Sequence, residues 1–186
     1  MASGGVTPKI MRCNGRTEFS KLWMQPEMKQ LLPAFCNLRK LSVYGIFVEF
    51  DLLWTTTLVL AAPCIEILHI EVWKHICDVD DKSRKLYTER RTHQWEMHFD
   101  GPKNRFLKEL EFSGFRSLEQ QFTFIRSMLE QAPNLKTIIL KGDERCDSCD
   151  ALGTPRPSEF PKKDEQEMVV RRIRDGIFSP RIIFYE

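Results

Sequence analysis

The sequence predicts an α/β fold, specifically a short, irregular leucine-rich-repeat solenoid with parallel strands and outer helices. Three observations predict it. A hydrophobic phrase with the spacing L-x-x-L-x-L recurs four times, two helix-length segments lie between its copies, and a proline ends each of these segments. Hydrophobic phrases repeated at roughly 20–29 residues are typical of leucine-rich repeats, where each copy supplies one strand of a continuous sheet.

The four copies start at residues 38, 65, 107 and 135, so successive copies are 27, 42 and 28 residues apart. Two intervals fit the repeat length, and the long one indicates a repeat that carries a charged insertion at about residues 78–105. We expect the repeats to occupy residues 35–144. Their strands should be parallel neighbours, with the leucine positions facing the core and the alternate positions facing solvent. These strands are residues 38–43, 65–70, 107–112 and 135–140.

The regular intervals each contain a segment long enough for a return helix. Residues 51–61 are rich in leucine, and residues 118–131 carry an apolar stripe with helical spacing. Pro63 and Pro133 follow these segments and cannot continue a helix. The stripe consists of Phe122, Ile125, Met128 and Leu129.

The two ends of the chain are predicted to differ. Residues 1–34 form an N-terminal tail or a partial cap, and the proline-containing residues 145–163 form a loop. Residues 164–186 provide a closing helix and strand. Asp164 is expected to cap the helix with Glu167 in capping-box spacing, Gly176 to end it, and residues 181–185 to form the strand.

Composition restricts the class of protein. The 186 residues include 28 basic and 26 acidic side chains, a net charge of +2 that provides no basic field for nucleic acid. No apolar run approaches the roughly 20 residues of a membrane-spanning helix, and no secretory signal is visible. We therefore expect a cytoplasmic or nuclear protein that binds neither nucleic acid nor membranes, with its six cysteines reduced.

Residues with catalytic or metal-binding potential are few. Cys146 and Cys149 have the spacing of half a zinc site or of a redox pair, but no second such pair follows. They remain weak candidates, and a small zinc-binding domain is an alternative reading. We expect no cofactor and no enzymatic activity, because no nucleophile or phosphate-binding motif is present. The four histidines lack metal spacing and are expected to face solvent: His69, His75, His93 and His98.

The outward positions of the repeat strands are the candidate partner-binding residues. Stacked strands would bring them together on the concave surface, where solenoids commonly bind other proteins. Tyr44, Ile67 and Ile139 favour this interpretation, since exposed aromatic and β-branched side chains suit an interface. The full set is Lys40, Ser42, Tyr44, Ile67, His69, Glu71, Glu109, Glu111, Ser113, Thr137, Ile139 and Lys141.

Residues 30–186 resemble the C-terminal part of plant leucine-rich-repeat F-box proteins, the group with FBD-like ends common in grasses. The resemblance is carried by LPAFCNLRKLSVYGIF, LLWTTTLVLAAPCIEILHIEVW, FLKELEFSGF, FTFIRSMLEQAPNLKTIIL and the closing SPRIIFYE. It implies a substrate-binding repeat region of a ubiquitin-ligase adaptor, with an unknown protein as its target.

The chain departs from that family at its beginning. An F-box has about 40 residues, and residues 1–34 are too short and too polar to form one, so we expect no binding to a Skp-type adaptor. A truncated structural remnant with no partner of its own is the alternative to a protein-interaction module.

Overall fold

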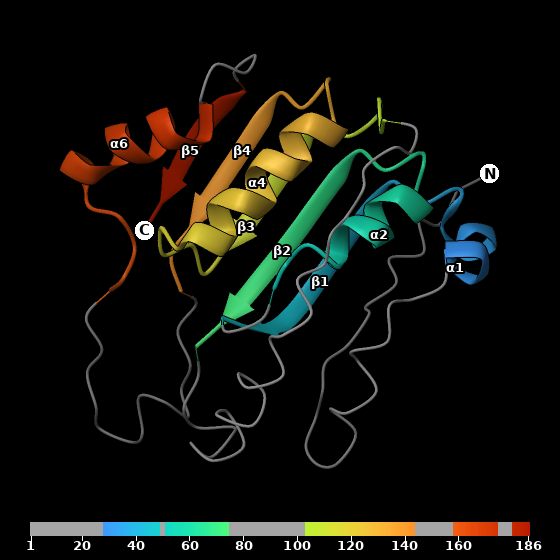
Figure 1. The fold of residues 1–186 in the computed structure, drawn as a ribbon, viewed down its shortest axis with the longest axis horizontal. Helices are drawn as coiled ribbons and strands as arrows, with labels where there is room; N and C mark the ends of the chain where they lie inside the picture. Colours follow the sequence, from blue (N-terminus) through green and yellow to red (C-terminus); the bar gives the residue numbers. More distant parts are fainter. Residues whose placement is uncertain (1–27, 49–50, 75–102, 144–157, 175–179) are drawn as a thin grey trace, which may run out of the picture.

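A single sheet of five parallel strands organises the chain (Figure 1). The structure is a computed structural model that describes residues 28–48, 51–74, 103–143, 158–174 and 180–186. Its strands lie in sequence order: β1 Lys40–Phe47, β2 Ile67–Trp73, β3 Glu109–Ser113, β4 Thr137–Lys141 and β5 Arg181–Tyr185. The helices are α1 Met28–Phe35, α2 Thr55–Ala61, α4 Glu119–Gln131 and α6 Lys163–Arg174.

The predicted parallel pairing is confirmed for all four repeat strands. Equivalent positions of the hydrophobic phrase align across the sheet, so that Leu41 pairs with Leu68, Leu68 with Leu110 and Leu110 with Ile138. Each of these strands begins two residues after the first apolar position of its copy, where Leu38, Ile65, Leu107 and Leu135 are buried. The phrase therefore sets the register, while its first residue anchors the chain just before the strand.

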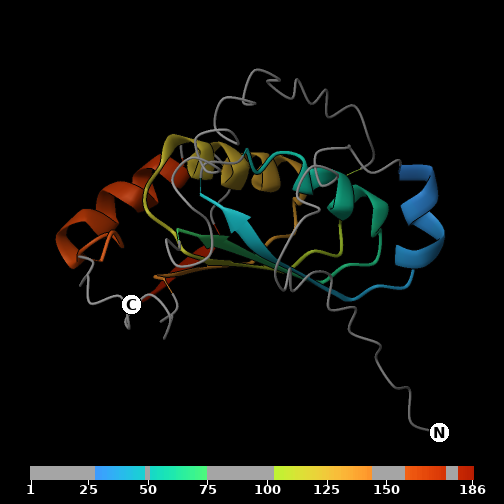
Figure 2. The ribbon, with the colours of Figure 1, turned by 90° about the horizontal axis from the view of Figure 1, so that it is seen from below.

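The molecule has two layers, a sheet and the helices that cover one face of it (Figures 1 and 2). α2, α4 and α6 lie on this face, and α1 lies beside α2 at the end of the layer. Side chains that alternate along the strands point into the core between the layers, among them Leu68, Phe112 and Leu140. Phe112 packs against Phe115 and Phe124 with ring centroids 6.0 Å apart in both pairs.

A repeated pattern of backbone hydrogen bonds joins the starts of the strands. The carbonyl oxygens of Arg39, Glu66 and Lys108 each accept two N–H groups from the next strand, at 2.8 to 3.2 Å. The carbonyl of Lys136 accepts the N–H of Arg181 at 2.8 Å. These four residues occupy equivalent positions of the repeated phrase. The start of each strand is therefore hydrogen-bonded to the start of the preceding strand, whatever the length of chain between them.

Asn104 fixes the chain where β3 begins. Its buried side chain donates to the carbonyl of Ala62 at 3.0 Å and accepts the N–H groups of Phe106 and Leu107 at 3.0 and 3.1 Å. A buried amide that satisfies backbone groups on two segments orders both of them. Asn104 thus holds the segment just before β3 against the end of α2.

The helices predicted at 51–61 and 164–174 are present, but both start at other residues than predicted. The segment 51–61 is helical only from Thr55, because the Asp51 carboxylate accepts the N–H of Leu53 at 2.9 Å and holds the preceding residues in a turn. α6 begins at Lys163, and Glu165 accepts the N–H of Lys162 at 2.9 Å. Asp164 is therefore inside the helix. The acidic residue that reaches back is Glu165 instead of Glu167, which pairs with Arg171 at 2.5 Å.

Several predicted segments lie outside the described residues. They are the tail up to residue 27, the insertion from 78 to 102, residues 145–157 of the proline-containing loop, and the helix stop at Gly176. Residues 158–162 of that loop are described and form no helix or strand. There Phe160 is buried and its ring lies 6.2 Å from that of Phe184 in β5.

Candidate functional site

The face of the sheet that none of the described helices covers holds the candidate site (Figure 2). Pairing in register places its side chains in rows that run across the strands. One row is Lys40, Ile67, Glu109, Thr137 and Arg181, and the next is Ser42, His69, Glu111, Ile139 and Ile183. Glu71, Ser113, Lys141 and Tyr185 form a third. We call these rows the open face. Eleven of the twelve candidate residues stand in register there, and the twelfth, Tyr44, lies in the irregular part of β1.

The expectation that every alternate position faces solvent is wrong for Ser42, His69, Glu71 and Ser113, which are buried. His69 is only 8% exposed, because it lies in a central strand between partners on both sides. Its Nε2 is 3.1 Å from the Ser113 hydroxyl, and the Tyr44 ring meets it edge-on with centroids 5.1 Å apart. His69 is thus a packed, hydrogen-bonded residue and not a solvent-facing one.

The remaining candidates are accessible to a partner. Lys40 is exposed, whereas the others are half-buried: Tyr44, Ile67, Glu109, Glu111, Thr137, Ile139 and Lys141. They combine aromatic, β-branched and charged side chains on neighbouring strands. Such a mixture of apolar contact area and oriented charge is what protein interfaces use.

An irregularity in β1 positions Tyr44. The register with β2 shifts between Val43 and Ile46, and Gly45 in between has a φ of +76°. A glycine inside a strand pattern often marks such a bulge, because it accepts a backbone conformation that other residues avoid. The bulge brings the Tyr44 ring against His69 on the neighbouring strand.

Lys141 and Glu111 form an ion pair across β3 and β4, in which the ammonium donates to the carboxylate. Burial raises the pKa of the Glu111 carboxyl, but the hydrogen bond from Lys141 and the positive charges of His69, Lys141 and Lys40 outweigh it. The net result is a pKa below the usual value of glutamate. The Glu111 carboxylate is therefore charged at neutral pH, and its ion pair with Lys141 orients both side chains.

Replacing Lys141 with methionine should raise the pKa of Glu111, because the hydrogen bond and a positive charge are both removed. A carboxyl with a lowered pKa stabilises the fold above its unfolded pKa of about 4.3, and this contribution is lost as pH falls through the folded pKa. Carbon-13 NMR titration of the Glu111 carboxyl measures the shift. Lys163→Met, which removes an exposed lysine from α6, is the control. A Glu111 midpoint unchanged by Lys141→Met would contradict the ion pair.

Sequence reasoning missed several residues of the open face. Alternation along β2 continues to Trp73, whose indole N–H donates to the Glu71 carboxylate. Alternation along β5 adds Arg181, Ile183 and Tyr185, which pair in register with β4. The same period of two that identified the other positions would have found these residues, if it had been continued to the end of β2 and applied to β5.

A buried arginine at the carboxyl ends of the strands was not foreseen either. The Arg116 side chain is 3% exposed, donates to the Gly114 carbonyl at 3.1 Å and to the Asp143 carboxylate, and lies 3.1 Å from the Glu159 carboxylate. Two carboxylates compensate the buried charge, as a cation in the interior requires. Its contacts join the end of β3 to the segments after β4 and before α6, which is a structural role.

The other chemical candidates give no site among the described residues. Cys146, Cys149, His75, His93 and His98 lie outside them, and so do Cys13 and Cys77. Within the described ranges, Cys36 and Cys64 are free thiols and no three potential metal ligands gather. Among the described helices, none is both long and apolar enough to span a membrane.

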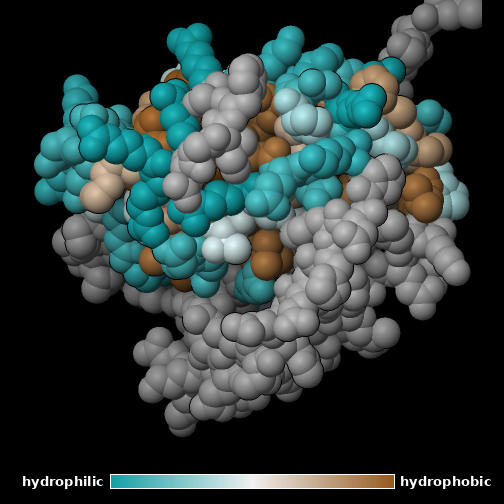
Figure 3. Space-filling model, turned by 45° about the horizontal axis from the view of Figure 1, so that its top comes forward, coloured by the Kyte–Doolittle hydropathy of each residue, from teal (hydrophilic) through white to brown (hydrophobic). Residues whose placement is uncertain are grey.

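The coloured residues in Figure 3 are mostly hydrophilic, with hydrophobic ones in small separate groups. The large apolar side chains exposed in the described part come from different elements and include Leu32, Phe106 and Met168. Scattered exposed apolar residues are normal for a protein surface. The open face differs from these scattered residues, because its side chains stand in register across neighbouring strands.

Together these features define an α/β protein with an all-parallel five-stranded sheet, one face of which carries helices. Comparison with protein-family models, curated proteins and solved structures finds no match.

Proposed function

We propose that this chain is a leucine-rich-repeat scaffold whose open face binds another protein. The observation that carries the proposal is the in-register arrangement of half-buried side chains across the strands on the face free of described helices. Tyr44, Ile67 and Ile139 supply apolar contact area, and the Glu111–Lys141 pair supplies fixed charges. Rigid strands hold these groups, so little side-chain freedom is lost on binding.

The regular contacts between successive copies of the hydrophobic phrase support the leucine-rich-repeat assignment. Equivalent carbonyls at residues 39, 66 and 108 receive equivalent N–H groups, and the leucine positions of the four copies stand in one register. Each repeat contacts its neighbours in the same way, which is how solenoid proteins stack. The resemblance to F-box proteins supports a target protein as the partner, recruited by these repeats.

The proposal is tested by photo-crosslinking from the two faces of the sheet. The full chain carries a benzophenone amino acid either at Thr137 on the open face or at Glu130, exposed at the end of α4 on the helix side. We expect one protein to be labelled from position 137 and not from position 130. Mass spectrometry then identifies it for binding measurements.

Binding of that purified partner should depend on the open face. Ile139→Asp is expected to weaken it by at least about tenfold, because a charge replaces an apolar contact at the centre of the face. Met168→Asp, on an exposed side chain of α6, should leave affinity unchanged. Thr137→Lys provides a second variant on the face in case Ile139→Asp folds poorly. Equal labelling from both positions, or full affinity in both open-face variants, would contradict the proposal.

A further inference from the structure

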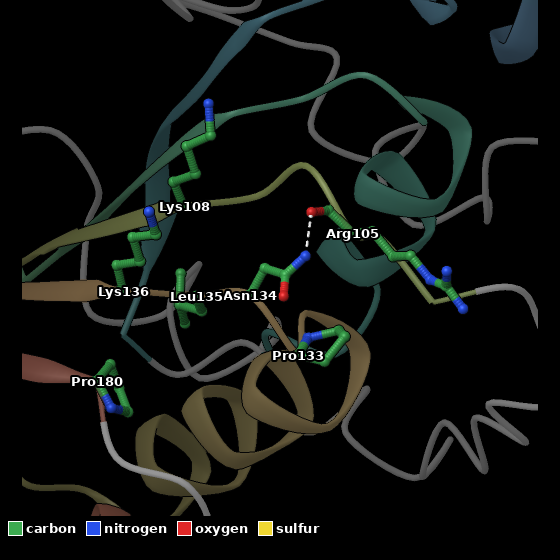
Figure 4. Close-up of a pocket in the computed structure, with 7 residues that line it drawn as sticks. All are labelled: Arg105, Lys108, Pro133, Asn134, Leu135, Lys136 and Pro180. Carbon is green, nitrogen blue, oxygen red and sulfur yellow. Dashed lines mark hydrogen bonds between the residues drawn. The ribbon is translucent and has the colours of Figure 1, made fainter.

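A hollow of about 510 Å³ lies at the amino ends of β3, β4 and β5, away from the carboxyl ends where Arg116 is buried (Figure 4). It is formed by the turn that leads from α4 into β4 and by the residues just before β3 and β5. The lining residues are Arg105, Lys108, Pro133, Asn134, Leu135, Lys136 and Pro180. Of these lining residues in the described part of the chain, three are basic, three are apolar and none is acidic.

Within the described part of the chain, the charge of Lys108 is compensated, whereas Lys136 and Arg105 have no acidic partner. Lys108 pairs with Glu66 at 2.7 Å, and Glu66 also pairs with Arg39 at 2.5 Å. Hydrogen bonds from Lys108 and Arg39 hold the pKa of this carboxyl below its usual range. Lys136 and Arg105 are exposed and have no carboxylate partner among the described residues. As far as the described residues go, the hollow therefore presents two cations, Lys136 and Arg105, that no carboxylate neutralises.

These cations lie on different sides of a fixed turn. Lys108 and Lys136 extend in the same direction from neighbouring strands, whereas the Arg105 guanidinium extends past the other side of Asn134 (Figure 4). The Asn134 side chain donates to the Arg105 carbonyl at 2.8 Å, which joins the turn to the segment before β3. Leu135 and Pro180 are buried and supply apolar surface on the Lys136 side of the hollow (Figure 4).

The available donors suit separate carboxylates better than one phosphate. Phosphate sites are usually cradled by free backbone N–H groups. Here the N–H groups of Lys136 and Thr137 donate to the Lys108 carbonyl, and that of Arg181 donates to the Lys136 carbonyl. None of the lining side chains that the structure describes is aromatic, so these residues offer no stacking platform of the kind that single-stranded nucleic-acid sites use.

We propose that this hollow binds a short acidic peptide segment of a partner protein. One acidic side chain pairs with Lys136 and another with Arg105, while an apolar side chain between them packs on Leu135 and Pro180. None of the lining residues belongs to the open face, so the proposal goes beyond the function proposed above.

The test uses the full chain and a fluorescein-labelled decapeptide of alternating glutamate and leucine. Anisotropy measures affinity, and amide NMR shifts locate the peptide. We expect the peptide to bind and to shift the amide signals of Asn134 and Lys136. Lys136→Glu should weaken this binding by at least about fivefold, because it reverses the charge that the peptide meets. Lys163→Glu makes the same charge change on exposed α6 and should alter affinity less than about twofold. Ile139→Asp on the open face should also leave it unchanged.

Three results would overturn the proposal. The first is no binding of the acidic peptide at millimolar concentration. The second is equal weakening by Lys136→Glu and Lys163→Glu, which would indicate only the overall charge. The third is displacement of the peptide by oligothymidylate of the same length and tighter binding of that oligonucleotide, which would make the hollow a nucleic-acid site.

Discussion

Replacing Ile138 with alanine is expected to lower the free energy of unfolding by about 2–5 kcal/mol. The side chain is 0% exposed and lies between Leu110 and Ile182 of the neighbouring strands, on the face that packs against the helices. Its loss removes apolar area from the core and leaves a cavity that the packed sheet cannot fill. Leu110→Ala should cost a similar amount, because Leu110 is equally buried.

The next residue provides a matched control. Ile139 has the same side chain in the same strand, but it points to the open face and is half-buried. Ile139→Ala should therefore cost only about 1 kcal/mol, since part of its apolar surface already meets water. Urea unfolding measures the loss of stability in both variants from the shift of the midpoint, provided that the dependence of the free energy on urea concentration stays the same. Equal losses at the two positions would contradict the assignment of core and open face in β4.

Gly114→Ala is expected to destabilise the fold by about 2–5 kcal/mol, through two separable costs. The residue has a φ of +76°, which a side chain disfavours by about 1–2 kcal/mol. A Cβ there would also lie 2.1 Å from the carbonyl oxygen of Val72. Because that contact is with backbone at the end of β2, relief requires β2 and β3 to separate.

Gly45 isolates the second cost. It has the same φ of +76°, but a Cβ there would meet nothing within 4 Å. Gly45→Ala should therefore cost only the conformational part, about 1–2 kcal/mol. Thermal and urea unfolding of both variants measure the difference between their free energies of unfolding. If only Gly114→Ala fails to fold, that result also supports the larger cost at Gly114. A Gly114→Ala protein as stable as Gly45→Ala would show that β2 and β3 do not approach so closely.

Much of the sheet is predictable because its signal is local and repeated. Four copies of one phrase, each with alternating apolar positions, define β1 to β4 and their parallel register. RIIFY, a short run of β-branched and aromatic residues, predicts β5. Helix starts are harder to predict, because one side-chain hydrogen bond, such as Asp51 to the Leu53 N–H, decides between a turn and another helical residue.

The candidate site is only partly predictable, because burial on the open face depends on neighbours from other strands. Period-two alternation identifies which residues share the face, but it does not distinguish His69 from Ile67. His69 is buried because Ser113, 44 residues later, and Tyr44, positioned by the Gly45 bulge, both contact it. Arg116 was missed for a related reason, since its partners Asp143 and Glu159 are distant in the sequence.

The backbone ladder at the strand starts makes the β2–β3 connection a permissive point for insertion. The second and third copies of the phrase are 42 residues apart and the third and fourth 28 apart, yet Glu66 and Lys108 receive the following strand in the same way. By the general dependence of loop-closure entropy on length, a connection half as long again costs only about 0.4 kcal/mol more. A lineage could therefore lengthen or exchange this connection repeatedly while the sheet, and every surface built on it, kept its geometry. Changes in the length of this connection would then have little effect on the free energy of unfolding.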